Sequence, residues 1–278
     1  MNKTVSPIRK DALQEIFGRE HHVLIGVVHL LPLPGAPAYQ GGGSSKILER
    51  ARTDAATYTE AGFDGLIVEN HGDIPFSKPE DLGPETAAHM SVVTNRLRLE
   101  YGLPVGINVL ANGAIHALAI ASAAGARFIR ANQWANAYIA NEGFIEGAAA
   151  KALRYRTLLG AQQIRIFADA HVKHGAHAIV DDRPLGELVR DVEFFDADAV
   201  IATGQRTGHS ADPDYIRSIQ SATSLPTLVG SGVTPENVNQ ILSIANGVIV
   251  ASALKVDGVW WNPVDRERAK RFVQNVKR

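Results

Sequence analysis

Short runs of β-branched and other apolar residues alternate with longer amphipathic segments along almost the whole chain. Continuous apolar runs predict strands buried on both faces, and the amphipathic segments predict helices. The strands recur about every 35 residues, which is the size of a strand-plus-helix unit. The eight expected strands are Val23–His29, Gly65–Asn70, Pro104–Val109, Arg127–Asn132, Ile164–Asp169, Ala199–Thr203, Thr227–Gly230 and Val248–Ala251.

This order predicts an α/β protein that forms a single (β/α)8 TIM barrel over residues 1–278. Residues 1–20 are expected to be a helical extension and residues 21–278 the barrel itself. A doubly wound sheet is the alternative, since a sequence does not show whether a sheet closes. The expected helices are Ser45–Ala61, Glu85–Tyr101, Ala114–Ala126, Gly147–Leu159, Pro184–Phe194, Asp214–Ala222, Glu236–Ile244 and Asp265–Lys277, with Gln133–Glu146 as a long loop.

Composition excludes several classes of protein and of chemistry. The chain has no Cys, which excludes disulfides, thiolate nucleophiles and Cys-based zinc sites. Lys and Arg total 28 against 29 Asp and Glu, so a basic nucleic-acid surface is not expected. Residues 1–18 lack the apolar core of a signal peptide, and Val23–Leu33 is too short to span a bilayer. We therefore expect a cytoplasmic protein that neither inserts into membranes nor binds nucleic acid.

Polar side chains gather where the expected strands end. Barrel enzymes carry their active sites at the carboxyl ends of the strands. Charged groups on strands covered on both faces need a partner or a ligand. We therefore expect a functional site built from His29, Glu69, Asn70, His71, Asn108, Arg130, Asn132, Asp169, His171, Thr203 and Gly204.

Residue chemistry divides this set into two roles. Glu69 and Asp169 are carboxylates suited to acid–base catalysis, with His29, His71 and His171 as proton carriers. The remaining members are expected to contact the substrate, as is His71. Glu69, Asp169 and His171 also suit a divalent metal, although no fixed ligand spacing marks one. For His29 and His71, a role as hydrogen-bonded core or loop histidines is equally open.

The sequence lacks the residues and motifs that several other enzyme mechanisms need. A Schiff-base aldolase needs a desolvated lysine aimed into the pocket, and the only candidate near a strand end is Lys173. No nucleophile elbow, Walker loop or dinucleotide fingerprint is present.

The last two strands end in small residues. Phosphate binds after strands seven and eight in many such barrels, where small residues let backbone N–H groups approach the anion. Thr234–Pro235–Glu236 predicts a helix N-terminus directly after this loop, and Lys255 adds a positive charge. A tight turn with no ligand is the alternative. The expected phosphate-binding residues are Gly230, Ser231, Gly232, Ala251 and Ser252.

Several of these segments resemble the BtpA/SgcQ family. The likeness runs from about His22 to Lys277 and implies a phosphate-binding TIM barrel akin to the tryptophan-synthase α and ribulose-phosphate-epimerase group. The family takes its name from a cyanobacterial protein needed for photosystem I biogenesis or stability, and another member lies in a bacterial sugar-uptake operon. No agreed reaction comes with the resemblance. It is carried by Gly26–Gly35, Val68–Asp73, Arg130–Asn132, Ala168–His174, Thr203–Gly204 and Gly230–Thr234.

Together these features favour an enzyme of carbohydrate metabolism. We expect a lyase or isomerase that acts on a phosphorylated sugar or nucleoside-like metabolite, and a homo-oligomer as its assembly. The first alternative is a non-catalytic biogenesis or stability factor for a membrane complex such as photosystem I, which only the family name motivates. The second is a sugar-phosphate sensor that binds its ligand without turnover.

Overall fold

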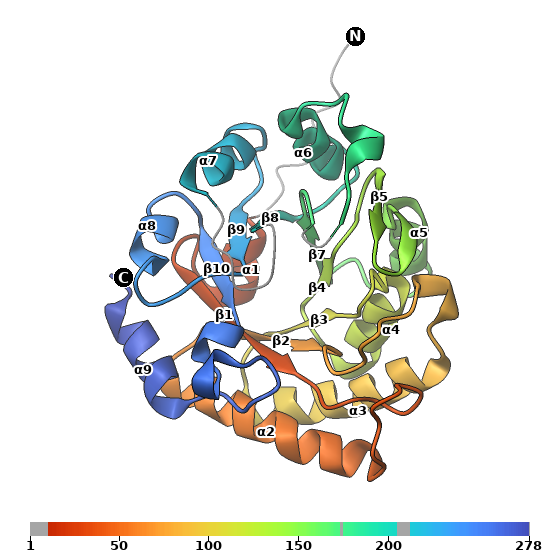
Figure 1. Ribbon diagram of the computed structural model, residues 1–278, viewed down its shortest axis with the longest axis vertical. Coiled ribbons are helices and arrows are strands. Elements are labelled where there is room, and N and C mark those ends of the chain that lie inside the picture. The colour runs from red at the N-terminus through yellow and green to blue at the C-terminus, as the bar shows by residue number, and fades with distance from the viewer. Residues whose placement is uncertain (1–10, 173–174, 205–211, 278) are drawn as a thin grey trace.

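Eight parallel strands close into a barrel at the centre of the computed structural model, which describes residues 11–172, 175–204 and 212–277. Around the barrel the strands follow the order β1, β10, β9, β8, β7, β4, β3, β2 (Figure 1). All eight predicted strands are confirmed, with ends within one residue of the prediction. They are β1 (Val23–His29), β2 (Gly65–Glu69), β3 (Val105–Asn108), β4 (Phe128–Ala131), β7 (Arg165–Asp169), β8 (Ala199–Thr203), β9 (Thr227–Gly230) and β10 (Gly247–Val250).

Helices surround the barrel and cover its outer face (Figure 1). The strand side chains that point outward pack with the apolar stripes of these helices in one large core, which includes Leu24, Tyr58 and Phe272. This arrangement buries both faces of every strand, as the apolar runs predicted. The covering helices are α2 (Gly43–Ala61), α3 (Pro84–Tyr101), α4 (Ala114–Ala124), α5 (Ala149–Leu158), α6 (Leu185–Phe194), α7 (Pro213–Ser221), α8 (Val238–Leu242) and α9 (Arg266–Asn275).

A second core fills the barrel interior and includes the first helix. Side chains that point inward, among them Phe128 and Phe167, stack with ring centroids 4.5 Å apart. Helix α1 (Ala12–Phe17) contributes Leu13 and Ile16 to the same cluster. Within the expected N-terminal extension, Ala12–Phe17 is helical and packs into the barrel core.

The segment expected to be one long loop after β4 contains a hairpin. Strands β5 (Ala137–Ala140) and β6 (Gly143–Glu146) pair antiparallel, outside the barrel sheet. The buried side chain of Asn112 fixes this segment, because its amide donates to the carbonyls of Gln133 and Glu146. The expectation of a structureless loop is wrong here, since this ordering contact comes from a residue 21 positions away in the chain.

None of the helices in the described residues combines the length and apolar character that a membrane crossing needs.

Candidate functional site

A cavity of about 260 Å³ opens among the carboxyl ends of the strands. One part of its wall carries His29, Glu69, His71 and Arg130, and another carries the small residues that follow β9 and β10. The barrel thus brings two of the acid–base candidates, His29 and Glu69, and most of the phosphate candidates to one cavity, as parallel strands with a common end predict.

Three titratable side chains from β1, β2 and the turn after β2 lie in contact. His71 Nδ1 is 2.9 Å from Glu69 Oε1, and His29 Nε2 is 3.5 Å from the same oxygen. The two imidazole rings stack with centroids 4.4 Å apart and planes 15° apart. The Trp260 carbonyl oxygen lies 3.1 Å from His29 Nδ1. These contacts fix the orientation of both histidines around one carboxylate oxygen.

Burial sets the charge of this cluster. It lowers the pKa of His29 to about 3, and a positive charge on His71 would add to this effect more strongly than Glu69 opposes it. Burial alone would raise the pKa of Glu69, but the hydrogen bond from His71 and the electrostatic interactions with the two histidines and Arg130 hold it well below its usual range. At neutral pH, Glu69 is ionised and His29 is neutral.

Arg130 and Asp169 form a buried ion pair beside this cluster. Arg130 Nε and Nη2 lie 3.0 and 2.9 Å from the two oxygens of Asp169, and Asn132 Nδ2 lies 3.3 Å from Oδ2. Both carboxylate oxygens of Asp169 therefore accept hydrogen bonds from Arg130. This pairing disfavours the expected role of Asp169 as a free base or metal ligand. Arg130 Nη1 has no partner among the described residues, and it remains available to a ligand.

Two buried amides beside these groups keep an acceptor free. Asn108 Nδ2 donates to Glu69 Oε2 at 2.6 Å. The side-chain oxygens of Asn108 and Asn132 are buried and have no hydrogen-bond partner in the described residues. Buried polar atoms are rarely left unsatisfied, so these oxygens mark places for a donor such as a substrate hydroxyl.

The loops after β9 and β10 form the small-residue wall of the cavity. Ser231 and Gly232 both have positive φ angles, 72° and 64°, and Asn237 holds the loop by donating to the Gly232 carbonyl. Ala251, Ser252 and Ala253 face them from the other loop. The predicted helix start at Thr234 is wrong: a turn spans Thr234–Asn237, where the Asn237 side chain accepts from the Thr234 amide, and α8 begins only at Val238.

Lys255 does not extend toward this cavity. Its ammonium group is fully buried and pairs with the buried carboxylate of Asp54 on α2. The expectation that Lys255 adds its charge to a phosphate site is therefore wrong, because Asp54 already neutralises it.

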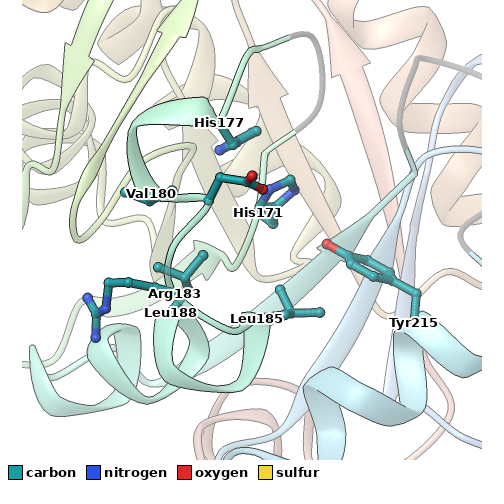
Figure 2. A pocket seen from close by; sticks show the side chains of 8 residues that line it. His171, His177, Val180, Arg183, Leu185, Leu188 and Tyr215 are labelled. Atoms are coloured by element: carbon teal, nitrogen blue, oxygen red, sulfur yellow. The ribbon is translucent and has the colours of Figure 1, made fainter.

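His171 lies apart, in a second pocket of about 220 Å³ between β7 and α6. Its ring stacks on His177 at 3.6 Å, and the Tyr215 hydroxyl points toward the pair across the pocket (Figure 2). Burial and the neighbouring His177 lower the pKa of His171 to about 4. Thr203 donates to the His171 carbonyl, and Gly204 follows directly. His171 is therefore in a different pocket from His29, Glu69, His71 and Arg130.

Asn70 has a structural role in place of the expected substrate contact, and Trp260 contributes to the site although the sequence did not predict it. Asn70 is fully buried and binds Asp73 and both backbone groups of Leu110, so it fixes loops and has no group left for substrate. Trp260 was not foreseen, although its carbonyl orients His29 and its ring meets His71 edge-on at 4.5 Å. Its only signal in the sequence is the Trp260–Trp261 pair beyond the last strand. Lys173 lies outside the described residues.

Comparisons with known proteins agree with this architecture. The model of the BtpA family matches residues 20–278. A protein of Pyrococcus furiosus is 44% identical over 252 residues, which cover 90% of this chain and 93% of the relative. The photosystem I biogenesis protein BtpA of Synechocystis is 39% identical over 264 residues, 91% of this chain and 88% of the relative. The solved N-(5'-phosphoribosyl)anthranilate isomerase of P. furiosus superposes with a TM-score of 0.56 at 13% identity and covers 92% of this chain and 98% of its own, a likeness of fold alone.

Proposed function

The chain belongs to the BtpA family, and from its site we propose that it is an enzyme that acts on a phosphorylated sugar or nucleoside-like metabolite by lyase or isomerase chemistry. One observation carries the proposal: a single cavity contains both a buried His–Glu–His cluster and two loops of small residues. Such loops suit a phosphate, and such a cluster suits proton transfer at another atom of the same ligand.

The phosphate end of the proposed site consists of Gly230, Ser231, Gly232, Ala251 and Ser252. Small side chains allow backbone N–H groups to approach an anion closely, and the Ser252 hydroxyl adds a further donor. Arg130 Nη1 supplies the positive edge of this cavity in place of Lys255. The isomerase with the similar fold acts, by its name, on a phosphoribosyl compound. That name agrees with the proposal, which depends on the cavity itself.

At the other end, we assign proton transfer to Glu69 and His71, with His29 beside them. His71 exchanges the proton with the substrate, and ionised Glu69, 2.9 Å from its Nδ1, orients the imidazole and stabilises its charged form. Asp169 becomes a positioning residue, because it holds Arg130 from both oxygens. The free acceptor oxygens of Asn108 and Asn132 orient substrate hydroxyls. His171, Thr203 and Gly204 would contact a substrate only if it extends toward the second pocket.

A binding screen tests the phosphate end. Phosphorylated sugars and nucleotides are compared with their dephosphorylated counterparts by thermal shift, since a ligand of the folded state raises the midpoint. In Gly230→Asp, the added Cβ would have ordinary contacts of 3.5 Å with Ile201 and 4.0 Å with Arg130, so the barrel accepts it while its carboxylate repels phosphate. Gly186→Asp on α6 is the matched control, with only Ala222 nearby at 3.6 Å. Equal shifts from both forms of each compound would refute a phosphate site.

Turnover tests the acid–base assignment once a ligand is found. Glu69→Gln keeps the shape of the side chain but removes its negative charge, and we expect kcat to fall by about 10²–10⁴-fold. If Glu69→Gln and Asp169→Asn both leave kcat unchanged, the assignment of these roles is wrong.

A second candidate function is a non-catalytic assembly factor, favoured by the name of the Synechocystis relative. Such a factor needs an outer surface for a partner, and large apolar side chains are exposed on α6 and beyond β10, with Phe194 83% and Trp261 64% exposed. Capture of membrane-complex subunits, lost in Phe194→Ser but kept in Glu69→Gln, would favour this role. The homo-oligomer stays a prediction, for which analytical ultracentrifugation is the test.

A further inference from the structure

Two hydrogen-bond acceptors face each other inside the His29–Glu69–His71 cluster. A carbonyl oxygen only accepts, so the contact with Trp260 places the proton of His29 on Nδ1. In this tautomer His29 Nε2 presents its lone pair, and it lies 3.5 Å from an oxygen of Glu69. Both groups are buried, with 7% and 5% of their surfaces exposed. Glu69 Oε1 accepts from His71, but the lone pair of His29 Nε2 faces this charged oxygen with no proton between the two atoms, an arrangement that a bound cation would stabilise.

Two of the three donor-atom distances in this cluster are close to those between ligands of one metal ion. Ligands at about 2.1 Å from a metal lie about 3.0–3.4 Å from each other in tetrahedral or octahedral geometry. Here the distances to Glu69 Oε1 are 2.9 and 3.5 Å, and one donor atom from each side chain lies within 4.8 Å of the other two. We propose that His29, Glu69 and His71 form a three-ligand site for a divalent transition metal of the zinc class, with its remaining positions open to the cavity.

Neighbouring groups hold the ligands as metal sites require. Metal-bound histidines usually donate their second N–H to a carbonyl or carboxylate, and His29 donates to Trp260 in this way. Asn108 occupies Glu69 Oε2 at 2.6 Å, which leaves Oε1 to face the imidazoles. His71 Nδ1 now donates to that oxygen, and the metal would take the place of this proton. The cluster is thus oriented before any ion binds.

The donor set indicates which metals fit. Two imidazoles and one carboxylate suit Zn²⁺, Co²⁺ and Fe²⁺ better than Ca²⁺ or Mg²⁺, which prefer oxygen ligands. This set differs from the one expected from the sequence, because Asp169 is held by Arg130 and His171 lines the second pocket. Three protein ligands leave room for a water or a substrate oxygen, so the ion could polarise a carbonyl or a hydroxyl in the cavity.

The metal site uses the same side chains as the proposed proton transfer, but its test needs no substrate. Untagged protein is freed of metal with a chelator and titrated calorimetrically with Zn²⁺ alone and with Co²⁺ alone. We expect one equivalent to bind, and His29→Gln, Glu69→Gln and His71→Gln each to weaken binding by at least about 100-fold. His89→Gln is the control, since His89 on α3 contacts Ser44 away from the cluster and should bind as the wild type does.

Three outcomes would overturn the site: no stoichiometric binding, equal losses in the control, or a loss in His171→Gln that the cluster variants do not share. If the cluster variants fail to fold, X-ray absorption of the zinc-loaded wild type decides, because the site requires two imidazoles and oxygen ligands. The phosphate screen on chelator-treated protein separates this result from the proposed function.

Discussion

Replacing Asp54 with Ala should destabilise the protein strongly and loosen one wall of the cavity. Asp54 lies on α2, is fully buried, and accepts from Lys255 Nζ, from Arg50 Nη1 at 2.7 Å and from the Val264 amide at 2.8 Å. It therefore fixes both ends of the segment 255–264 to one helix. That segment includes Trp260, which orients His29.

The size of the effect follows from the charge left behind. Lys255 has no exposed surface, so Asp54→Ala leaves a buried ammonium group unpaired, which costs about 3–5 kcal/mol. In a chain of this size that loss lowers the midpoint of thermal unfolding by roughly 10 °C. Urea unfolding followed by circular dichroism measures the change in the free energy of unfolding.

Glu100→Ala is the matched control for this prediction. Glu100 on α3 pairs with Arg52, which lies on α2 as Asp54 does, and this ion pair is exposed. Exposed pairs contribute about 0–1 kcal/mol to stability. The double variant Asp54→Leu, Lys255→Met should recover part of the loss, since an apolar pair replaces the buried ions, although the Val264 amide then lacks the acceptor that Asp54 provides. If Asp54→Ala costs no more than Glu100→Ala, the buried pair does not hold this segment.

Three further predictions address the barrel and its two pockets. Arg130→Met should lower the free energy of chemical unfolding by about 3–5 kcal/mol, because it leaves the buried Asp169 carboxylate without its partner, and Arg130→Lys should not restore the bidentate pair. A decrease below 1 kcal/mol in Arg130→Met would contradict this. The pKa of His171 lies near 4 in the folded protein against an ordinary 6.5, so its contribution to stability is complete above pH 6.5 and declines as the pH falls toward 4; His171→Gln should show a shallower decline over this window, and identical slopes would refute the assignment. Leu13→Ala should cost about 2–5 kcal/mol if α1 belongs to the inner core, whereas a detached extension would tolerate it.

The sequence predicted the barrel well because strand burial is a local property. Each strand is covered on both faces, so its apolar run is readable without knowledge of its neighbours. The hairpin of β5 and β6 escaped prediction because its strands are short and only partly buried, and because a distant residue, Asn112, holds it in place. Helix α8 was placed too early because the Thr234–Pro235–Glu236 pattern also fits the turn that precedes it.

The candidate site was predicted as a set of strand ends, but its internal pairing was not. The expected set includes both Glu69 and Asn70, yet successive side chains leave a strand on opposite faces, and only Glu69 reaches the cavity. Asp169 and His171 share a strand-end motif but have different partners, Arg130 and His177. These choices depend on neighbours that are distant in the chain, which residue type and spacing do not encode.

One segment connects the two ends of the cavity, and this follows from the way α2 holds it. The chain after β10 places Ser252 at the small-residue wall, and eight residues later it places the Trp260 carbonyl against His29. Between them, Lys255 anchors the segment to Asp54 in a buried pair. A ligand that orders the loop at Ser252 therefore acts on the same short stretch of chain that sets the tautomer of His29. We infer that phosphate binding and the chemistry at the His29–Glu69–His71 cluster are coupled through this segment, so that Asp54→Ala should weaken the binding of both a phosphorylated ligand and Zn²⁺, although Asp54 touches neither.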